Sequence, residues 1–133
     1  MRVYLASRYS RRDEMARFAQ YLRRSGVIVT SRWIDERLAL DHTLNDCTPE
    51  HNLRVARIDL DDIDEADVVI FHSADPLVGT PRGGRHVEFG YAMGVGKRLV
   101  VIGGRENIFH FLPAVQHYAT ITEFLNAEGI GRE

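Results

Sequence analysis

Short apolar runs that alternate with helical patterns constrain the fold of this 133-residue chain more than any other feature of its sequence. The runs are apolar on both faces, and we expect them to form strands at residues 3–5, 27–29, 66–71 and 99–102, with a short fifth strand near 118–121. Strands of this kind, separated by helices, are typical of a parallel sheet that helices cover on both sides. The sequence therefore predicts one α/β domain over residues 1–133, a flavodoxin-like three-layer sandwich with a five-stranded parallel sheet.

The segments between these runs carry helical spacing and helix-end signals. Apolar residues recur on one face within 13–24, and Gly26 follows where helices often end. Thr48 and Pro49 are typical of an N-cap followed by proline at the first helical position, so we expect a helix from there to about Glu65. The remaining expected elements are a mobile loop over 32–48, a helix over 85–95 and a last helix after Thr122.

Composition excludes several classes of protein. The formal net charge is -2, so no excess of positive charge indicates binding to nucleic acid or to a membrane surface. The single cysteine, Cys47, cannot form an intramolecular disulfide, and no apolar run approaches the roughly 18 residues of a membrane span. The first residues are too short for the core of a signal peptide. We therefore expect a cytoplasmic protein with no nucleic-acid or membrane partner.

Asp59 differs from the other acids of the segment 59–65. Its neighbours three and four residues away include Val55, Ala56 and Ile63, so it borders an apolar stripe, whereas the other acids are expected to form a solvated helix face. A carboxylate that faces inward is unfavourable unless it is paired or functional. Because a helix spreads these acids around its axis, we expect no metal ion, although a phosphate-handling enzyme with a divalent metal remains a third hypothesis.

A glycine pair leads into the helix that carries Glu88. Gly83 and Gly84 expose backbone N–H groups at a helix N-terminus, which is suited to an anion or a sugar, although a merely flexible loop explains the pair equally well. Glu88 is interpreted as a catalytic carboxylate, as an acid that favours the helix N-terminus, or as a partner of Arg85. The loop is not G-x-G-x-x-G, so a dinucleotide site is unsupported and no cofactor is expected.

Polar side chains follow the first strand at an edge where parallel sheets bind ligands. Tyr4 lies at the end of this strand, and Ser7, Arg8, Ser10 and Arg11 come next. Hydroxyl and guanidinium groups suit a phosphate or a sugar hydroxyl. The alternative is a core tyrosine with arginines that face solvent, and the residue types alone leave both open.

Three motifs together resemble a known enzyme family. They are Val3-Tyr4-Leu5-Ala6, then Asp59 followed by Ile63-Asp64-Glu65-Ala66-Asp67-Val68-Val69, then Glu88-Phe89-Gly90-Tyr91-Ala92 followed by Gly96-Lys97. In this order they resemble the nucleoside 2-deoxyribosyltransferase family, which includes the 2'-deoxynucleoside 5'-phosphate N-hydrolases and related cytidylate hydrolases. The resemblance runs from the first strand to about Ile102.

The resemblance implies cleavage of the N-glycosidic bond of a nucleoside or nucleotide. It implies that Glu88 is the nucleophile and forms a glycosyl ester, that Asp59 protonates or holds the leaving base, and that Tyr4 orients Glu88. It also implies a homodimer or larger homo-oligomer whose pocket is completed across an interface, with Asn107 as the candidate contribution. The family needs no cofactor for this chemistry.

The substrate is less defined than the reaction. Trp33 lies in a region where base-contacting groups are expected, and Arg8, Arg11, Arg82 and Arg85 favour a 5'-phosphate. Transfer to a second base and hydrolysis by water both stay open. A non-catalytic nucleotide-binding module, in which Glu88 only shapes the pocket, is the alternative function.

Overall fold

The computed structural model describes residues 1–35, 48–73 and 83–131. The strands are β1 (Arg2–Ala6), β2 (Ile28–Val29), β3 (Val68–His72), β4 (Arg98–Ile102) and β5 (Val115–Tyr118). The α-helices are α1 (Arg12–Arg24), α2 (Pro49–Asp64), α3 (Gly84–Gly94) and α4 (Ile121–Glu128). Short 3₁₀ helices cover η1 (Tyr9–Arg11), η2 (Arg32–Ile34) and η4 (Ile108–Phe111).

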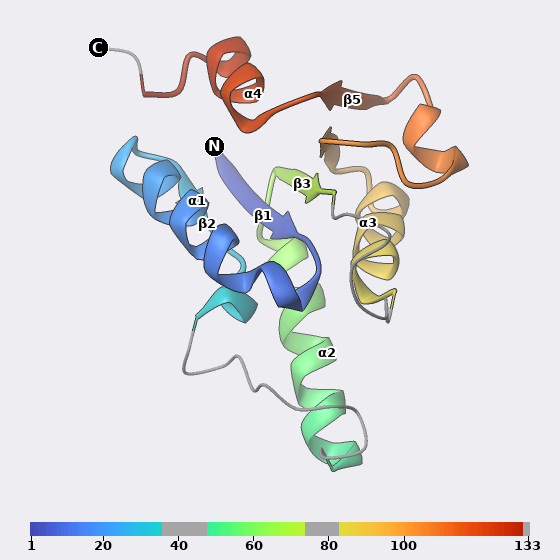
Figure 1. Cartoon of the computed structure of the whole chain (residues 1–133). Helices are drawn as coiled ribbons and strands as arrows, with labels where there is room; N and C mark the ends of the chain where they lie inside the picture. Colours follow the sequence, from blue (N-terminus) through green and yellow to red (C-terminus); the bar gives the residue numbers. More distant parts are fainter. Residues whose placement is uncertain (36–47, 74–82, 132–133) are drawn as a thin grey trace.

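The five strands form one sheet in the order β2-β1-β3-β4-β5, and every pair of neighbours is parallel. This is the flavodoxin-like order, and the predicted fold class is confirmed. Figure 1 shows the helices arranged around these strands. Because all strands run the same way, the polar segments after β1, β3 and β4 reach the same edge of the sheet.

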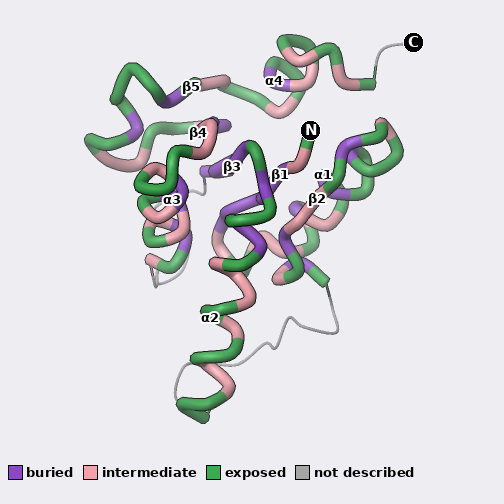
Figure 2. Tube along the Cα trace, turned by 180° about the vertical axis from the view of Figure 1, so that it is seen from behind, coloured by how far each residue is buried: buried purple, intermediate pink, exposed green. Residues whose placement is uncertain are grey.

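Alternating side chains of the strands enter two separate cores. Val3 and Leu5 of β1 pack with α1 and α4 on one face of the sheet, whereas Tyr4 and Ala6 pack toward α2 and α3 on the other. In Figure 2 the buried residues concentrate along the central strands, with exposed residues on the outer sides of the helices. The face covered by α2 and α3 is the one that receives the Tyr4 hydroxyl.

The helix-end signals of the sequence correspond to real caps. The Thr48 side chain accepts a hydrogen bond from the backbone N–H of His51, and Pro49 is the first residue of α2. Gly83 precedes α3 with φ of 80°, a left-handed conformation that other residues rarely adopt. This conformation lets the chain enter α3 directly from the loop after β3.

Several predicted boundaries were wrong. The fifth strand is Val115–Tyr118 rather than 118–121, because Val115 pairs with Leu99 and enters the core, while Thr120 caps α4. The last helix therefore begins at Ile121, before Thr122. Within the predicted loop 32–48, residues 32–34 form a 3₁₀ helix with Ile34 buried; residues 36–47, including Cys47, lie outside the described residues.

No helix in the described part of the chain is both long and apolar enough to cross a membrane.

Candidate functional site

Tyr4 connects β1 to α3 within the second core. The residue is fully buried on β1, and its hydroxyl donates a hydrogen bond to Oε2 of Glu88 at 2.7 Å. Burial and the nearby charges of Glu88 and Asp59 raise the pKa of Tyr4 well above its usual value. The phenol therefore stays protonated and acts as a fixed donor to this carboxyl group.

Glu88 lies one turn into α3 and is half-buried against β1 and α2. Its pKa is raised to about 8, mainly by burial and further by the charge of Asp59, whereas the hydrogen bond from Tyr4 acts in the opposite direction. The bond to Tyr4 stabilises the ionised form because a carboxylate accepts more strongly than a carboxylic acid. Glu88 does not pair with Arg85, which was one of the interpretations open from the sequence.

Asp59 lies on the face of α2 that packs against the site. Its Oδ1 atom is buried and has no hydrogen-bond partner among the described residues. Burial raises its pKa to about 7; the charge of Asp62 raises it as well, and the charge of Arg32 lowers it. The prediction that Asp59 borders the apolar stripe of its helix agrees with this partly buried position.

Tyr4, Asp59 and Glu88 form a pair of interacting carboxyl groups, each partly buried, with one phenol donor. With pKa values of about 7 for Asp59 and about 8 for Glu88, the two carboxyl groups hold about one proton between them near neutral pH. Although the hydrogen bond from Tyr4 lowers the pKa of Glu88, that pKa is still the higher of the two, so the free site favours the proton on Glu88. The pair therefore offers one carboxylate and one carboxylic acid.

The glycine pair stands at the start of α3, as the sequence indicated. Gly83 and Gly84 have open space where a Cβ would lie. Arg85, in contrast, is buried and forms an ion pair with Glu106 at 2.7 Å. The side chain of Asn107 caps η4 by accepting a hydrogen bond from the backbone N–H of Phe109. Its Nδ2 atom lies 3.3 Å from Nδ1 of His86, so Asn107 is next to the first turn of α3.

Two of the residues after β1 form hydrogen bonds within the chain, and a third, Arg8, lies near the first turn of α3. Ser7 donates to the carbonyl of His72, and Arg11 is held by Glu14 and by the carbonyl of Ser73. Arg8 is close enough for its charge to lower the pKa of His86. Arg82 lies outside the described residues.

Trp33 is half-buried and lies between the two cores. Its indole Nε1 donates to the carbonyl of Leu5 at 2.7 Å, and its ring packs against both clusters. Its polar group is therefore used within the chain, and only the ring surface is left for contact with another molecule.

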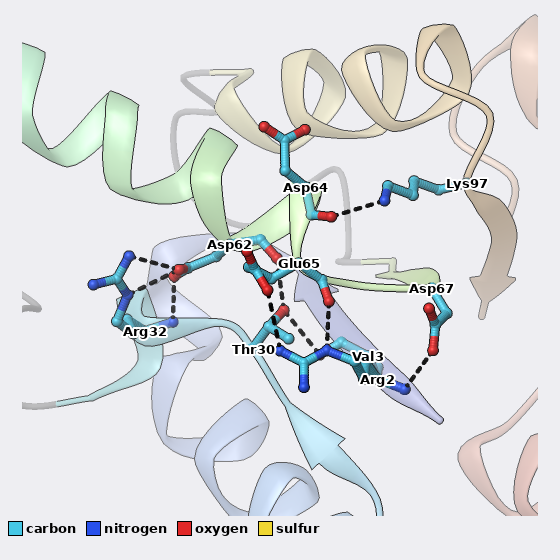
Figure 3. A network of polar contacts seen from close by, with 9 residues as sticks. All are labelled: Arg2, Val3, Thr30, Arg32, Asp62, Asp64, Glu65, Asp67 and Lys97. Carbon is cyan, nitrogen blue, oxygen red and sulfur yellow. Dashed lines mark hydrogen bonds and ion pairs between the residues drawn. The ribbon is translucent and has the colours of Figure 1, made fainter.

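An ion pair between the buried Asp62 and the half-exposed Arg32 was missed by the sequence analysis. Asp62 is only 4% exposed, although it was counted among the solvated acids of its segment. Figure 3 shows its carboxylate held by the side chain and backbone N–H of Arg32. The three-residue spacing from Asp59 places it on the same helix face, a signal that the sequence did contain.

No three histidine, cysteine or acidic side chains within 1–35, 48–73 and 83–131 come together so that they could hold a metal ion.

The fold and this site define a class of protein. A doubly wound α/β domain with two interacting carboxyl groups beneath one end of its parallel sheet is a flavodoxin-like domain equipped for acid–base or nucleophilic chemistry. The sequence model of the family described as nucleoside 2-deoxyribosyltransferase matches residues 3–125. The chain therefore belongs to the nucleoside 2-deoxyribosyltransferase family.

Solved structures with this fold have low sequence identity to the chain. The CMP N-glycosidase BcmB of Clostridium botulinum aligns with a TM-score of 0.61 and 21% identity, over 97% of this chain and 98% of that one. A 2-deoxyribosyltransferase from Bacillus psychrosaccharolyticus aligns with a TM-score of 0.72 and 20% identity, over 95% of this chain and 91% of that one. No curated protein sequence matches the chain.

Proposed function

We propose that this chain cleaves the N-glycosidic bond of a nucleoside or 2'-deoxynucleoside, or of its 5'-monophosphate, and passes the sugar to a second base or to water. The observation that carries the proposal is the 2.7 Å hydrogen bond from Tyr4 to the buried carboxyl group of Glu88, beside Asp59. Membership of the nucleoside 2-deoxyribosyltransferase family supports the same reaction class.

In the first step, the proton that the two carboxyl groups share moves to Asp59, and the ionised oxygen of Glu88, which the hydrogen bond from Tyr4 stabilises, attacks the anomeric carbon of the sugar. The bond from this carbon to Glu88 forms as the bond to the base nitrogen breaks, and the electron pair leaves with the base. Asp59 gives its proton to the leaving base, and Tyr4 keeps the Glu88 carboxylate oriented. A carboxylate stabilises the oxocarbenium-like transition state and then traps the sugar as an ester.

In the second step, a second base or a water molecule attacks the same carbon and the ester bond to Glu88 breaks. Asp59, now ionised, takes the proton that the incoming group loses. Two displacements at one carbon retain its configuration. Transfer and hydrolysis share these residues and differ only in the acceptor.

The groups proposed to surround the substrate come from several loops that meet at one edge of the sheet. They are Ser7, Arg8, Trp33, Gly83, Gly84, Arg85 and Asn107. Arg11 and Arg85 pair with acids of the chain. Arg8 is proposed to contact a 5'-phosphate, because its charge acts on His86 in the first turn of α3, beside the glycine pair. Arg85 would act by holding the first turn of α3. The neighbours named as a CMP N-glycosidase and a 2-deoxyribosyltransferase are compatible with either kind of substrate.

We also propose that the chain forms a homodimer or a larger homo-oligomer. Large apolar side chains are exposed in the segment after β4: Ile108, Phe109, Phe111 and Leu112. This segment adjoins Asn107 and is mostly exposed in Figure 2. A second copy that covered it would bring another chain next to the first turn of α3. Light scattering of the wild-type chain and of Phe109→Glu tests the assembly: a monomeric wild type would contradict it.

Released base provides the test of activity. The chain is incubated with nucleosides and their 5'-monophosphates, with and without a second free base, and products are separated by chromatography. We expect free base or an exchanged nucleoside from the wild type and none from Glu88→Gln. Tight binding of intact nucleotide with no product over long incubation would contradict the proposal and favour a nucleotide-binding module.

A further inference from the structure

We propose that Asp62, through its ion pair with Arg32, is a positioning residue for Asp59. It joins the last turns of α2 to the segment after β2 and holds a carboxyl group paired with Arg32 one turn away from the Asp59 carboxyl group. The inference rests on the proposed function only in assigning Asp59 the role of proton donor.

The ion pair joins a buried carboxylate to a half-exposed guanidinium: the Asp62 side chain is 5% exposed and that of Arg32 is 50% exposed. Oδ2 of Asp62 accepts from the backbone N–H of Arg32 at 2.9 Å, and Oδ1 accepts from Nε at 2.8 Å and lies 2.8 Å from Nη2. Because the guanidinium holds one oxygen of Asp62 and the backbone N–H holds the other, the contacts fix orientation as well as distance.

Further hydrogen bonds join the segment after β2 to α2 and to β1. Thr30 donates to the carbonyl of Asp62 at 2.8 Å and approaches the carbonyl of Val3, so it connects α2 to β1 (Figure 3). Ser31 accepts from the backbone N–H of Leu5 at 2.6 Å. The Asp62–Arg32 pair therefore belongs to a hydrogen-bond network that fixes the position of α2 relative to β1, the strand that carries Tyr4.

Asp59 occupies the same face of α2, one turn before Asp62. At this spacing the two carboxyl groups are neighbours on the helix surface. The charged groups that act on the pKa of Asp59 are Asp62 from α2 and Arg32 from η2. The charge of Asp59 in turn raises the pKa of Glu88 on α3 and of Tyr4 on β1. Asp62 raises and Arg32 lowers the pKa of Asp59, so the pair balances its acidity as well as its position.

The test compares Asp62→Asn with Asp61→Asn. Both variants remove one negative charge from adjacent positions of α2, but Asp61 is exposed and Asp62 is buried. The Asp59 carboxyl group is followed by carbon-detected NMR titration, which needs no activity. In Asp62→Asn we expect the pKa of Asp59 to fall by about one unit, because Arg32 stays while its opposing charge is lost. In Asp61→Asn we expect no change.

A second variant, Arg32→Lys, keeps the positive charge but loses the paired contacts of Nε and Nη2 with Asp62. We expect the titration of Asp59 to stay at the wild-type value, and kcat for base release to fall roughly 3- to 10-fold with little change in KM, because position rather than charge is altered. Thermal unfolding checks that each variant is folded. Arg32→Lys also keeps the proposal testable if Asp62→Asn does not fold.

Two results would overturn the inference. One is an Asp59 titration in Asp62→Asn that coincides with that of Asp61→Asn, and the other is a wild-type kcat in Arg32→Lys. Failure of the proposed function is a different result: wild-type protein would release no base from any substrate, while the NMR titration would still report on Asp62 and Asp59.

Discussion

Tyr4 donates its hydroxyl hydrogen to Glu88, a carboxyl group that lies 84 residues further along the chain. The bond crosses from β1 to α3, and it joins a fully buried phenol to a carboxyl group that is half-buried. It stabilises a charge on Glu88 that burial and Asp59 disfavour. The relationship gives the two carboxyl groups of the site different roles and allows each role to be tested.

Replacing Tyr4 with phenylalanine keeps the ring in the core and removes only the donor. Because the hydrogen bond from Tyr4 lowers the pKa of Glu88, its loss raises that pKa, and the acid limb of the pH–rate profile should move to higher pH. We expect kcat to fall by about 10-fold or more. Tyr21→Phe, which removes an exposed hydroxyl from α1, serves as the control. An unchanged profile in Tyr4→Phe would contradict this role.

Burial of Glu88 should make stability fall as the pH rises. Its pKa is raised from 4.5 to about 8 in the folded chain, so its contribution to stability is full below its unfolded pKa and is lost as the pH rises through about 8. Glu88→Gln cannot ionise, so its free energy of unfolding should fall less between pH 5 and pH 9 than that of the wild type. The difference between the two decreases should be roughly 2–5 kcal/mol. Urea unfolding at the two pH values measures this. Glu50→Gln, at an exposed position, should parallel the wild type.

Arg8 should distinguish a monophosphate from a free nucleoside. If its guanidinium contacts a 5'-phosphate, Arg8→Gln should raise KM for the monophosphate by about 10-fold or more, with little change in kcat and no change for the nucleoside. Steady-state kinetics with both substrates measure the difference. Arg17→Gln, on the exposed face of α1, is the control. Equal effects on both substrates would rule out a phosphate contact.

The buried ion pair between Arg85 and Glu106 should stabilise the fold strongly. Both side chains are at most 10% exposed, so Glu106→Gln leaves a buried guanidinium without a compensating charge, at a cost of about 3–5 kcal/mol. The exposed pair of Arg2 and Glu65 provides the comparison, since Glu65→Gln should cost less than about 1 kcal/mol. Urea unfolding compares them. Similar losses in the two variants would show that burial does not set the energy of the Arg85 pair.

The fold could be predicted from the sequence because its signals are local. The short apolar runs became β1, β3 and β4, and the cap formed by Thr48 and Pro49 begins α2. The fifth strand was misplaced because its residues are mixed, and only pairing with β4 sets its register. Local periodicity does not contain that information.

The site could be predicted only in part. Spacing placed Asp59 next to the apolar stripe of its helix, but the roles of Tyr4 and Glu88 came with the family resemblance. Asp62 was missed because its partner, Arg32, lies 30 residues away and is brought to it only by the packing of α2 against the segment after β2. Glu106, the partner of Arg85, was missed because it lies 21 residues away and only the folded chain brings the two together.

Trapping of the sugar on Glu88 tests the central claim most directly. The wild-type chain is mixed with a substrate that releases base, quenched with acid within the first turnovers, digested and analysed by mass spectrometry. We predict that the peptide containing Glu88 carries the mass of the sugar, and that the adduct is absent in Glu88→Gln, which should also lose at least about 1,000-fold in rate. Base release that proceeds undiminished in Glu88→Gln, with no sugar on any peptide, would contradict the account.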